Sequence, residues 1–174
     1  KSAVCQGCTN RCRLTVNSFG DGKRFISGNQ CEKGLGKATA GEQLPNLYEF
    51  KRNYLTSLKS ENGARGTVGM PLALGMYELL PLWHAVFTRL GFNVKVSPMS
   101  TRRIYEKGQF SIPSDTACYP AKIMHGHIET LITDGVDAIF YPCLTYNMDE
   151  KMTDNHYNCP VVAYYSELLN GNVE

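Results

Sequence analysis

Short apolar segments alternate with longer amphipathic segments from Thr67 onward, and this alternation constrains the fold more than any other feature of the sequence. Such alternation is typical of βαβ units, in which helices connect parallel strands. Four segments have the length and composition of strands: Thr67–Met70, Phe92–Ser97, Asp137–Tyr141 and Val161–Tyr165. The sequence therefore predicts an α/β domain with a doubly wound, mostly parallel four-stranded sheet, in which Thr67–Met70 is central.

The segments between these strands have apolar residues at helical spacing. The first helix is predicted to begin near Leu80, because Pro81 suits a first helical turn, and to end at Gly91. A short helix is expected over 104–107. The strongest pattern begins at Pro120 and continues until Gly135 closes it. These helices are expected to cover both faces of the sheet.

The first 37 residues differ from the rest, because they contain few long aliphatic side chains and many Cys, Gly, Asn and Arg residues. So little apolar surface does not support an independent core. Two β-compatible runs, Arg13–Phe19 and Arg24–Ser27, flank a favoured hairpin-turn pair, Asp21-Gly22. The predicted organisation is a cysteine-rich metal-binding hairpin module over 1–37, a tether over 38–66 and the α/β domain over 67–174.

Four cysteines of the hairpin module have the spacing of a metal site. Cys5, Cys8 and Cys12 are clustered, and Cys31 follows the hairpin. Four thiolates can close a tetrahedral zinc site, and metal binding can order a segment that lacks a core. Closely spaced cysteines also resemble iron–sulfur binding runs. We expect a metal at these four residues, with zinc favoured over an iron–sulfur cluster. Four reduced thiols without metal are the alternative.

Two further cysteines lie where ligand sites form in the expected fold. Cys143 follows the strand 137–141, and Cys118 precedes the helix at Pro120. Strand ends and helix starts share one edge of a parallel sheet, and a helix N-terminus favours the thiolate. We expect Cys118 and Cys143 to face one crevice, although cysteine is also a common core residue. Cys159 precedes the expected fourth strand and is assigned to core packing.

Histidines and tyrosines give weaker signals. His125 and His127 lie on the long expected helix near its apolar face, where hydrogen-bonded structural histidines are expected. Tyr119, Tyr141 and Tyr146 are candidates for lining the crevice, although tyrosine is also frequent in strands and on surfaces.

Charge and composition argue against several functions. The net charge of +2 comes from 18 basic and 16 acidic residues. The chain therefore lacks the concentrated positive charge that binding to nucleic acid or an anionic membrane requires. No apolar run approaches the roughly 18 residues of a membrane span, and no phosphate-binding loop or dinucleotide fingerprint is present. Seven cysteines, several of them clustered, suit a reducing compartment. The chain is expected to be cytoplasmic and, because it begins at Lys1, a fragment of a larger protein.

Several longer motifs resemble a known family. They are the runs Gly69–Trp83, Ser114–Lys122, His125–His127 and Phe140–Cys143. Together they resemble the uncharacterised domain that accompanies CoA-substrate-specific enzyme activases in long bacterial proteins. The start of the chain, Cys5–Thr15 with Phe25–Glu32, resembles the segment that precedes that domain.

That domain is similar to subunits of 2-hydroxyacyl-CoA dehydratases and to double-cubane cluster proteins. Cysteines at strand and helix ends hold iron–sulfur clusters there, and Cys118 and Cys143 match two of them. The resemblance implies an iron–sulfur cluster at these two residues in the full-length protein, with a third cysteine from a later domain. It also implies two partners: a fused or separate ATP-hydrolysing activase that delivers a low-potential electron, and the remaining dehydratase-like domain.

Three functions remain open at this point. The leading hypothesis is that the chain is part of an iron–sulfur electron-accepting component, which an ATP-dependent activase serves in anaerobic metabolism. The isolated fragment is expected to be inactive. The second is a non-enzymatic, metal-stapled docking or scaffold domain of an activase fusion protein. The third is a flavodoxin-like domain that binds a nucleotide or CoA.

Overall fold

Three parallel strands form the sheet of the larger unit, with β4 (Thr67–Met70) between β5 (Asn93–Val96) and β6 (Ala138–Ile139). The structure, a computed structural model, describes residues 1–36, 45–60 and 63–173. The chain divides into two units, Lys1–Leu47 and Tyr48–Glu174. The α/β class, the parallel sheet and the central place of Thr67–Met70 are confirmed.

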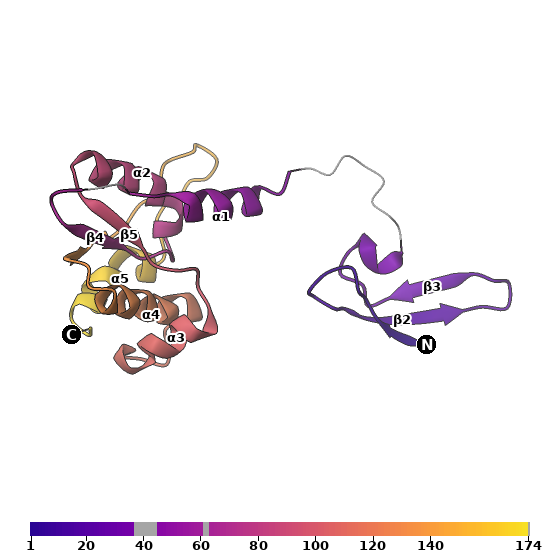
Figure 1. Cartoon of the computed structure of the whole chain (residues 1–174). Coiled ribbons are helices and arrows are strands. Elements are labelled where there is room, and N and C mark those ends of the chain that lie inside the picture. Colours follow the sequence, from indigo (N-terminus) through magenta and orange to yellow (C-terminus); the bar gives the residue numbers. More distant parts are fainter. Residues whose placement is uncertain (37–44, 61–62, 174) are drawn as a thin grey trace. The chain divides into compact units, whose positions relative to one another are not determined.

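One face of the sheet is covered by α1 (Leu47–Ser57) and α2 (Met76–Arg89) (Figure 1). Leu55 of α1 is 1% exposed and packs in one apolar cluster with β4 and α2. The helix α1 lies within the span 38–66 that was expected to be a tether, so part of that span belongs to the core of the larger unit. Residues 37–44 and 61–62 of this region lie outside the described residues.

The helix α2 begins earlier than the sequence predicts. Pro81 was expected in the first turn, but a full turn precedes it and the proline lies inside the helix. An interior proline removes one backbone hydrogen bond. Met76 and Leu80, both fully buried, add apolar burial in the extra turn, which offsets this cost.

The opposite face is covered by α4 (Tyr119–Thr133) and α5 (Pro160–Asn170) (Figure 1). The expected fourth strand, Val161–Tyr165, is wrong, because this segment forms the first half of α5. Val161, Tyr165 and Leu169 pack in one cluster at a spacing of four residues, which is a helical pattern. The proline at position 160 fits the first turn of a helix as well as it fits a strand entrance. The described sheet therefore has three strands, not four.

The short helix α3 (Arg102–Gly108), followed by the 3-10 turn η2 (Gln109–Ser111), crosses α4 at a contact between backbones. A Cβ atom on Gly126 would lie 1.7 Å from the carbonyl oxygen of Ile104, and one on Gly108 would lie 2.1 Å from the nitrogen of Gly126. Only glycine permits this approach. The crossing fixes the position of α4 and of the two histidines that flank Gly126.

The smaller unit contains an antiparallel sheet of β1 (Ser2–Val4), β2 (Arg13–Ser18) and β3 (Arg24–Ser27), followed by the 3-10 turn η1 (Glu32–Leu35). The expected hairpin is confirmed, and Gly22 in its turn has a φ of 79°, which favours glycine. Cys5 and Leu14 are the buried hydrophobic residues described in this unit. Such a small core agrees with the expectation that the unit needs another source of stability.

Candidate cysteine site

Cys143 lies in the segment after β6 and is exposed. Its Sγ atom is 2.8 Å from Oγ of Ser166 and 4.0 Å from Oε1 of Glu167, both on α5. The thiol that follows the strand therefore contacts a helix that the sequence did not predict. The sequence did not identify Ser166 as a neighbour of Cys143, because the helix α5 was not predicted.

Cys118 is the N-cap residue of α4 and is exposed. Its side chain makes no capping hydrogen bond, whereas Thr101, the N-cap of α3, accepts one from the backbone N–H of Ile104 at 3.3 Å. The Cys118 thiol is thus not used to satisfy the helix end.

Cys159 is the N-cap residue of α5, and its backbone conformation almost repeats that of Cys118. Its φ and ψ are −62° and 155°, against −65° and 156° at Cys118, and its side chain also makes no capping hydrogen bond. It is exposed. The assignment of Cys159 to core packing is therefore wrong, because a helix rather than a buried strand follows it. The sequence signal was Pro160, a favoured first helical residue.

The helices α4 and α5 run alongside each other in the same direction. Tyr165, six residues after Cys159, lies with its Oη 3.0 Å from Nε2 of His125, seven residues after Cys118. Further along, Ile128 of α4 and Leu169 of α5 pack in the same cluster. This register places both N-caps at the carboxyl edge of the sheet.

Two buried tyrosine hydroxyls lie close to the three cysteines. The pKa of Tyr141 is raised well above its usual range, first by burial and then by the negative charges of Cys143, Tyr165 and Cys159. Burial raises the pKa of Tyr165, and the charge of Cys118 adds to this shift. The Tyr141 hydroxyl is buried and has no hydrogen-bond partner within the described part of the chain. It can donate to a ligand at this edge.

The other two tyrosine candidates, Tyr119 and Tyr146, are exposed. Tyr119 packs against Tyr105 with ring centroids 5.3 Å apart. Tyr146 pairs with Tyr157 at 4.6 Å in the exposed segment between β6 and α5. Of the three candidates from the sequence, Tyr141 is the one with a buried hydroxyl near the cysteines.

The two histidines of α4 are buried and hydrogen bonded, as expected of structural residues. The Ser111 hydroxyl donates to the Gly108 carbonyl at 3.1 Å, so its oxygen accepts from Nδ1–H of His125 at 2.9 Å. Nε2 of His125 is then the acceptor for the Tyr165 hydroxyl. His127 lies between Oγ of Ser97, at 2.7 Å, and Oγ of Ser100, at 2.8 Å. Burial lowers the pKa of His125 and lowers that of His127 to about 4.

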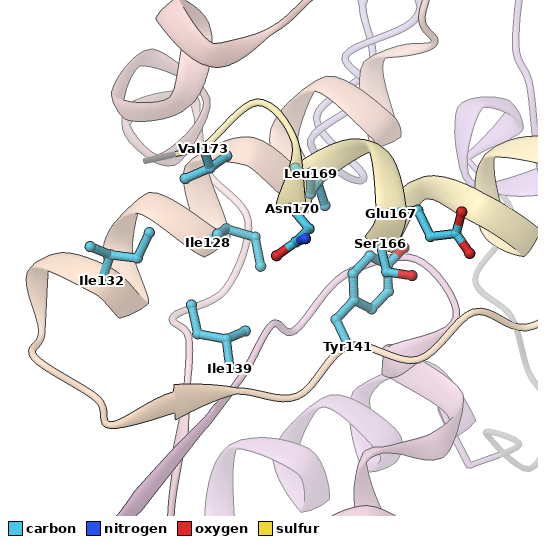
Figure 2. Close-up of a pocket in the computed structure, with 9 residues that line it drawn as sticks. All are labelled: Ile128, Ile132, Ile139, Tyr141, Ser166, Glu167, Leu169, Asn170 and Val173. Atoms are coloured by element: carbon cyan, nitrogen blue, oxygen red, sulfur yellow. The ribbon is translucent and has the colours of Figure 1, made fainter.

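A pocket of about 430 Å³ lies along α5 (Figure 2). Its apolar walls come from α4, β6 and α5, and Tyr141, Ser166 and Glu167 line one end. In Figure 2 the Tyr141 ring and the Ser166 side chain lie next to each other. The residues that contact the Cys143 thiol therefore also form a wall of this pocket.

The four cysteines of the smaller unit come to one end of its sheet. Cys5, Cys8 and Cys12 lie between β1 and β2, and Cys31 follows β3, whose last residue pairs with Thr15 near the start of β2. Two sulfurs accept hydrogen bonds: Sγ of Cys5 from the Gly7 backbone N–H at 3.4 Å, and Sγ of Cys12 from the Asn10 amide at 3.0 Å.

The described residues contain no group of three or more His, Cys, Asp or Glu side chains already arranged to hold a metal ion. This applies to the small unit and to the sheet edge alike. The metal assigned to Cys5, Cys8, Cys12 and Cys31 stays a prediction, as does the role of Cys118 and Cys143.

Comparison with known proteins gives one match. Residues 67–174 match the family model described as the CoA enzyme activase uncharacterised domain. The match covers more than half of the chain and includes β4 through α5, together with the cysteines at the sheet edge. No curated protein and no solved structure matches the chain. No helix among residues 1–36, 45–60 and 63–173 is long and apolar enough to cross a membrane.

Proposed function

Because this chain belongs to the family of CoA enzyme activase uncharacterised domains, we propose that it is part of an electron-accepting component that holds an iron–sulfur cluster through Cys118 and Cys143. The observation that carries the proposal is the position of two exposed thiols at the carboxyl edge of a parallel sheet, where ligands bind in folds of this class. The likeness to 2-hydroxyacyl-CoA dehydratase subunits supplies the type of chemistry.

The donor groups at this edge fit such a cofactor. Cysteine thiolates are the usual ligands of iron–sulfur clusters. The Cys118 side chain makes no capping hydrogen bond, so its sulfur is available to a ligand. The Tyr141 hydroxyl has no partner in the part of the chain that the structure describes, so it is a buried hydrogen-bond donor for a negatively charged group.

When bound, an iron–sulfur cluster accepts a single low-potential electron. The protein's own groups hold it and remain in fixed protonation states. Cys118 and Cys143 lose their protons when they ligate a metal. Tyr165 and His125 stay neutral and hydrogen bonded, because burial raises the pKa of the tyrosine and lowers that of the histidine.

We propose that an ATP-hydrolysing activase, fused or separate, delivers the electron, and that a further dehydratase-like domain completes the component. The description of the matching family, which names a CoA enzyme activase, supports this pairing. We propose that the chemistry takes place in the cytoplasm, because clustered cysteines that serve as metal ligands suit a reducing compartment.

We propose that the smaller unit is stabilised separately by a metal, preferably zinc, at Cys5, Cys8, Cys12 and Cys31. The small core of this unit and the hydrogen bonds to two of the sulfurs support this. Four thiolates are a common structural zinc site, and the binding energy of such a metal stabilises the fold directly.

Anaerobic reconstitution with ferrous iron and sulfide tests the cluster. The iron and sulfide bound by the wild-type chain should be largely lost in a double variant with Cys118→Ser and Cys143→Ser. Cys8→Ser is the matched control, because it removes a thiol of the smaller unit only. Equal iron and sulfide in the double variant and in the wild type would rule out a cluster at Cys118 and Cys143.

A further inference from the structure

We propose that Cys159 is the third thiolate of the iron–sulfur site, so that Cys118, Cys143 and Cys159 of this one chain hold the cluster together. The proposal rests on the proposed function and changes its ligand set. The third cysteine was expected from a later domain, but the structure places one at the same sheet edge.

The equivalence of two helix starts is the first reason. Cys118 and Cys159 occupy the N-cap position of neighbouring helices, with φ and ψ that agree within a few degrees. Neither side chain caps its helix, and a proline lies in the first turn of both. Two thiols are thus held in the same way, and neither is used to stabilise its own helix end.

The register of the two helices is the second reason. The hydrogen bond between Tyr165 and His125 aligns α5 with α4 about two turns from each N-cap. A Cβ atom built on Gly75, in the loop that follows β4, would lie 3.3 Å from a side-chain carbon of Val162. The start of α5 therefore lies beside the loop at the carboxyl end of β4, the same edge at which α4 begins.

The position of Cys143 beside α5 is the third reason. Its sulfur contacts Ser166 on α5, at 2.8 Å, so the thiol that follows β6 lies against the helix that Cys159 begins. Tyr141, two residues before Cys143, has a buried hydroxyl that lacks a partner among the described residues.

The exposure of Cys159 argues against a packing role. Unliganded cysteine is among the residues most often buried, yet Cys118, Cys143 and Cys159 are all exposed at this edge. The described residues contain no ready group of three donors for a single ion. An iron–sulfur cluster is wider than an ion and takes its thiolates at separate corners, which suits donors from three different segments.

Differential alkylation of the whole chain tests the proposal. The anaerobically reconstituted protein and the metal-free protein are each treated briefly with iodoacetamide and digested with trypsin. Lys107, Lys122 and Lys151 separate Cys118, Cys143 and Cys159 into three different peptides. If Cys159 is a ligand, its alkylation should fall by roughly tenfold or more on reconstitution, together with that of the other two.

The outcomes distinguish the two proposals. Protection of Cys118 and Cys143 with unchanged alkylation of Cys159 would overturn the assignment of Cys159 and leave the proposed function standing. Unchanged alkylation of all three would overturn both.

A variant gives an independent measurement. Cys159→Ser should lose as much reconstituted iron as Cys118→Ser does. Serine is a favoured N-cap residue, so neither substitution should disturb its helix. The fluorescence of Trp83, the only tryptophan, reports whether the larger unit stays folded. A folded Cys159→Ser protein that binds as much iron as the wild type would show that Cys159 is not a ligand.

Discussion

The contact between Tyr165 and His125 links α5 to α4 next to the cysteine edge. Tyr165 is 5% exposed, and its hydroxyl is the donor for Nε2 of the fully buried His125. Tyr165→Phe removes the donor and leaves a buried acceptor unpaired. The free energy of unfolding should fall by about 1–3 kcal/mol.

Urea unfolding followed by Trp83 fluorescence measures this loss, because Trp83 packs in the core of the larger unit, 4.6 Å from Phe140 between ring centroids. Tyr164→Phe is the control: Tyr164 is 57% exposed, and its variant should stay within about 0.5 kcal/mol of the wild type. Equal stability of the two variants would mean that the Tyr165 hydroxyl bond contributes nothing.

The buried His127 should make the larger unit less stable in acid. Burial lowers its pKa from 6.5 to about 4, so the unfolded chain binds a proton more tightly than the folded one. This stability is fully present above pH 6.5 and is lost as the pH falls towards 4. Between about pH 7.5 and pH 5 the loss from His127 alone should be about 2 kcal/mol.

Urea unfolding of the wild type and of His127→Gln at both pH values tests this. The buried His125 and His84 also have lowered pKa values, so the variant should keep a smaller loss in acid. An equal loss in both proteins would contradict the role given to His127.

Two cysteines of the proposed site could be placed at the sheet edge from the sequence, but Cys159 could not. Cys118 and Cys143 flank segments whose periodicity identifies them as a helix and a strand, and topology then brings both to one edge. Cys159 precedes Val161-Val162, and β-branched residues favour a strand locally. Because the segment after Cys159 was predicted as a strand and not as a helix, Cys159 was assigned to core packing.

At the level of elements, the crossing of α3 and α4 depends on the glycine between the two histidines. A side chain at Gly126 would collide with the backbone of Ile104 rather than with a flexible side chain. Gly126→Ala should therefore reduce the free energy of unfolding of the larger unit by at least about 2 kcal/mol.

Urea unfolding with Trp83 fluorescence measures this as well. Gly171→Ala is the matched control, because the nearest described atom to a Cβ there would be the carbonyl oxygen of Leu168, at 3.7 Å, and the residue ends α5 with a φ of −90°. If Gly126→Ala were as stable as Gly171→Ala, the helices would not be held in contact at this crossing.

Elements with strong local signals were predictable. The hairpin, α4 and the three parallel strands follow from turn residues and periodicity. The start of α2 was not predictable from the sequence, because the burial of Met76 and Leu80 outweighs the local preference of Pro81 for a first turn. The helix α1 was missed because its burial rests largely on Leu55, whose partners are distant in sequence.

On the scale of the whole molecule, the two units should depend on different stabilising interactions. The smaller unit should contain about one equivalent of zinc or iron after purification, measured in a background with Cys118→Ser and Cys143→Ser. Cys8→Ser should release that metal and remove the protection of backbone amides in β2 and β3 against hydrogen exchange.

Unfolding of the larger unit, followed by Trp83 fluorescence, should be unchanged by Cys8→Ser. Less than about half an equivalent of metal before the substitution would contradict the metal assignment, given the tight binding usual for four-thiolate sites.

Electron paramagnetic resonance at low temperature tests the central claim most directly. The protein is reconstituted anaerobically and reduced with titanium(III) citrate, and every sample carries Cys8→Ser so that the smaller unit cannot contribute. We predict a paramagnetic signal from one reduced iron–sulfur cluster, abolished when Cys118→Ser and Cys143→Ser are added while Trp83 fluorescence stays native. An unaltered signal in that variant, or no signal before the two cysteines are replaced, would contradict an electron-accepting cluster at this sheet edge.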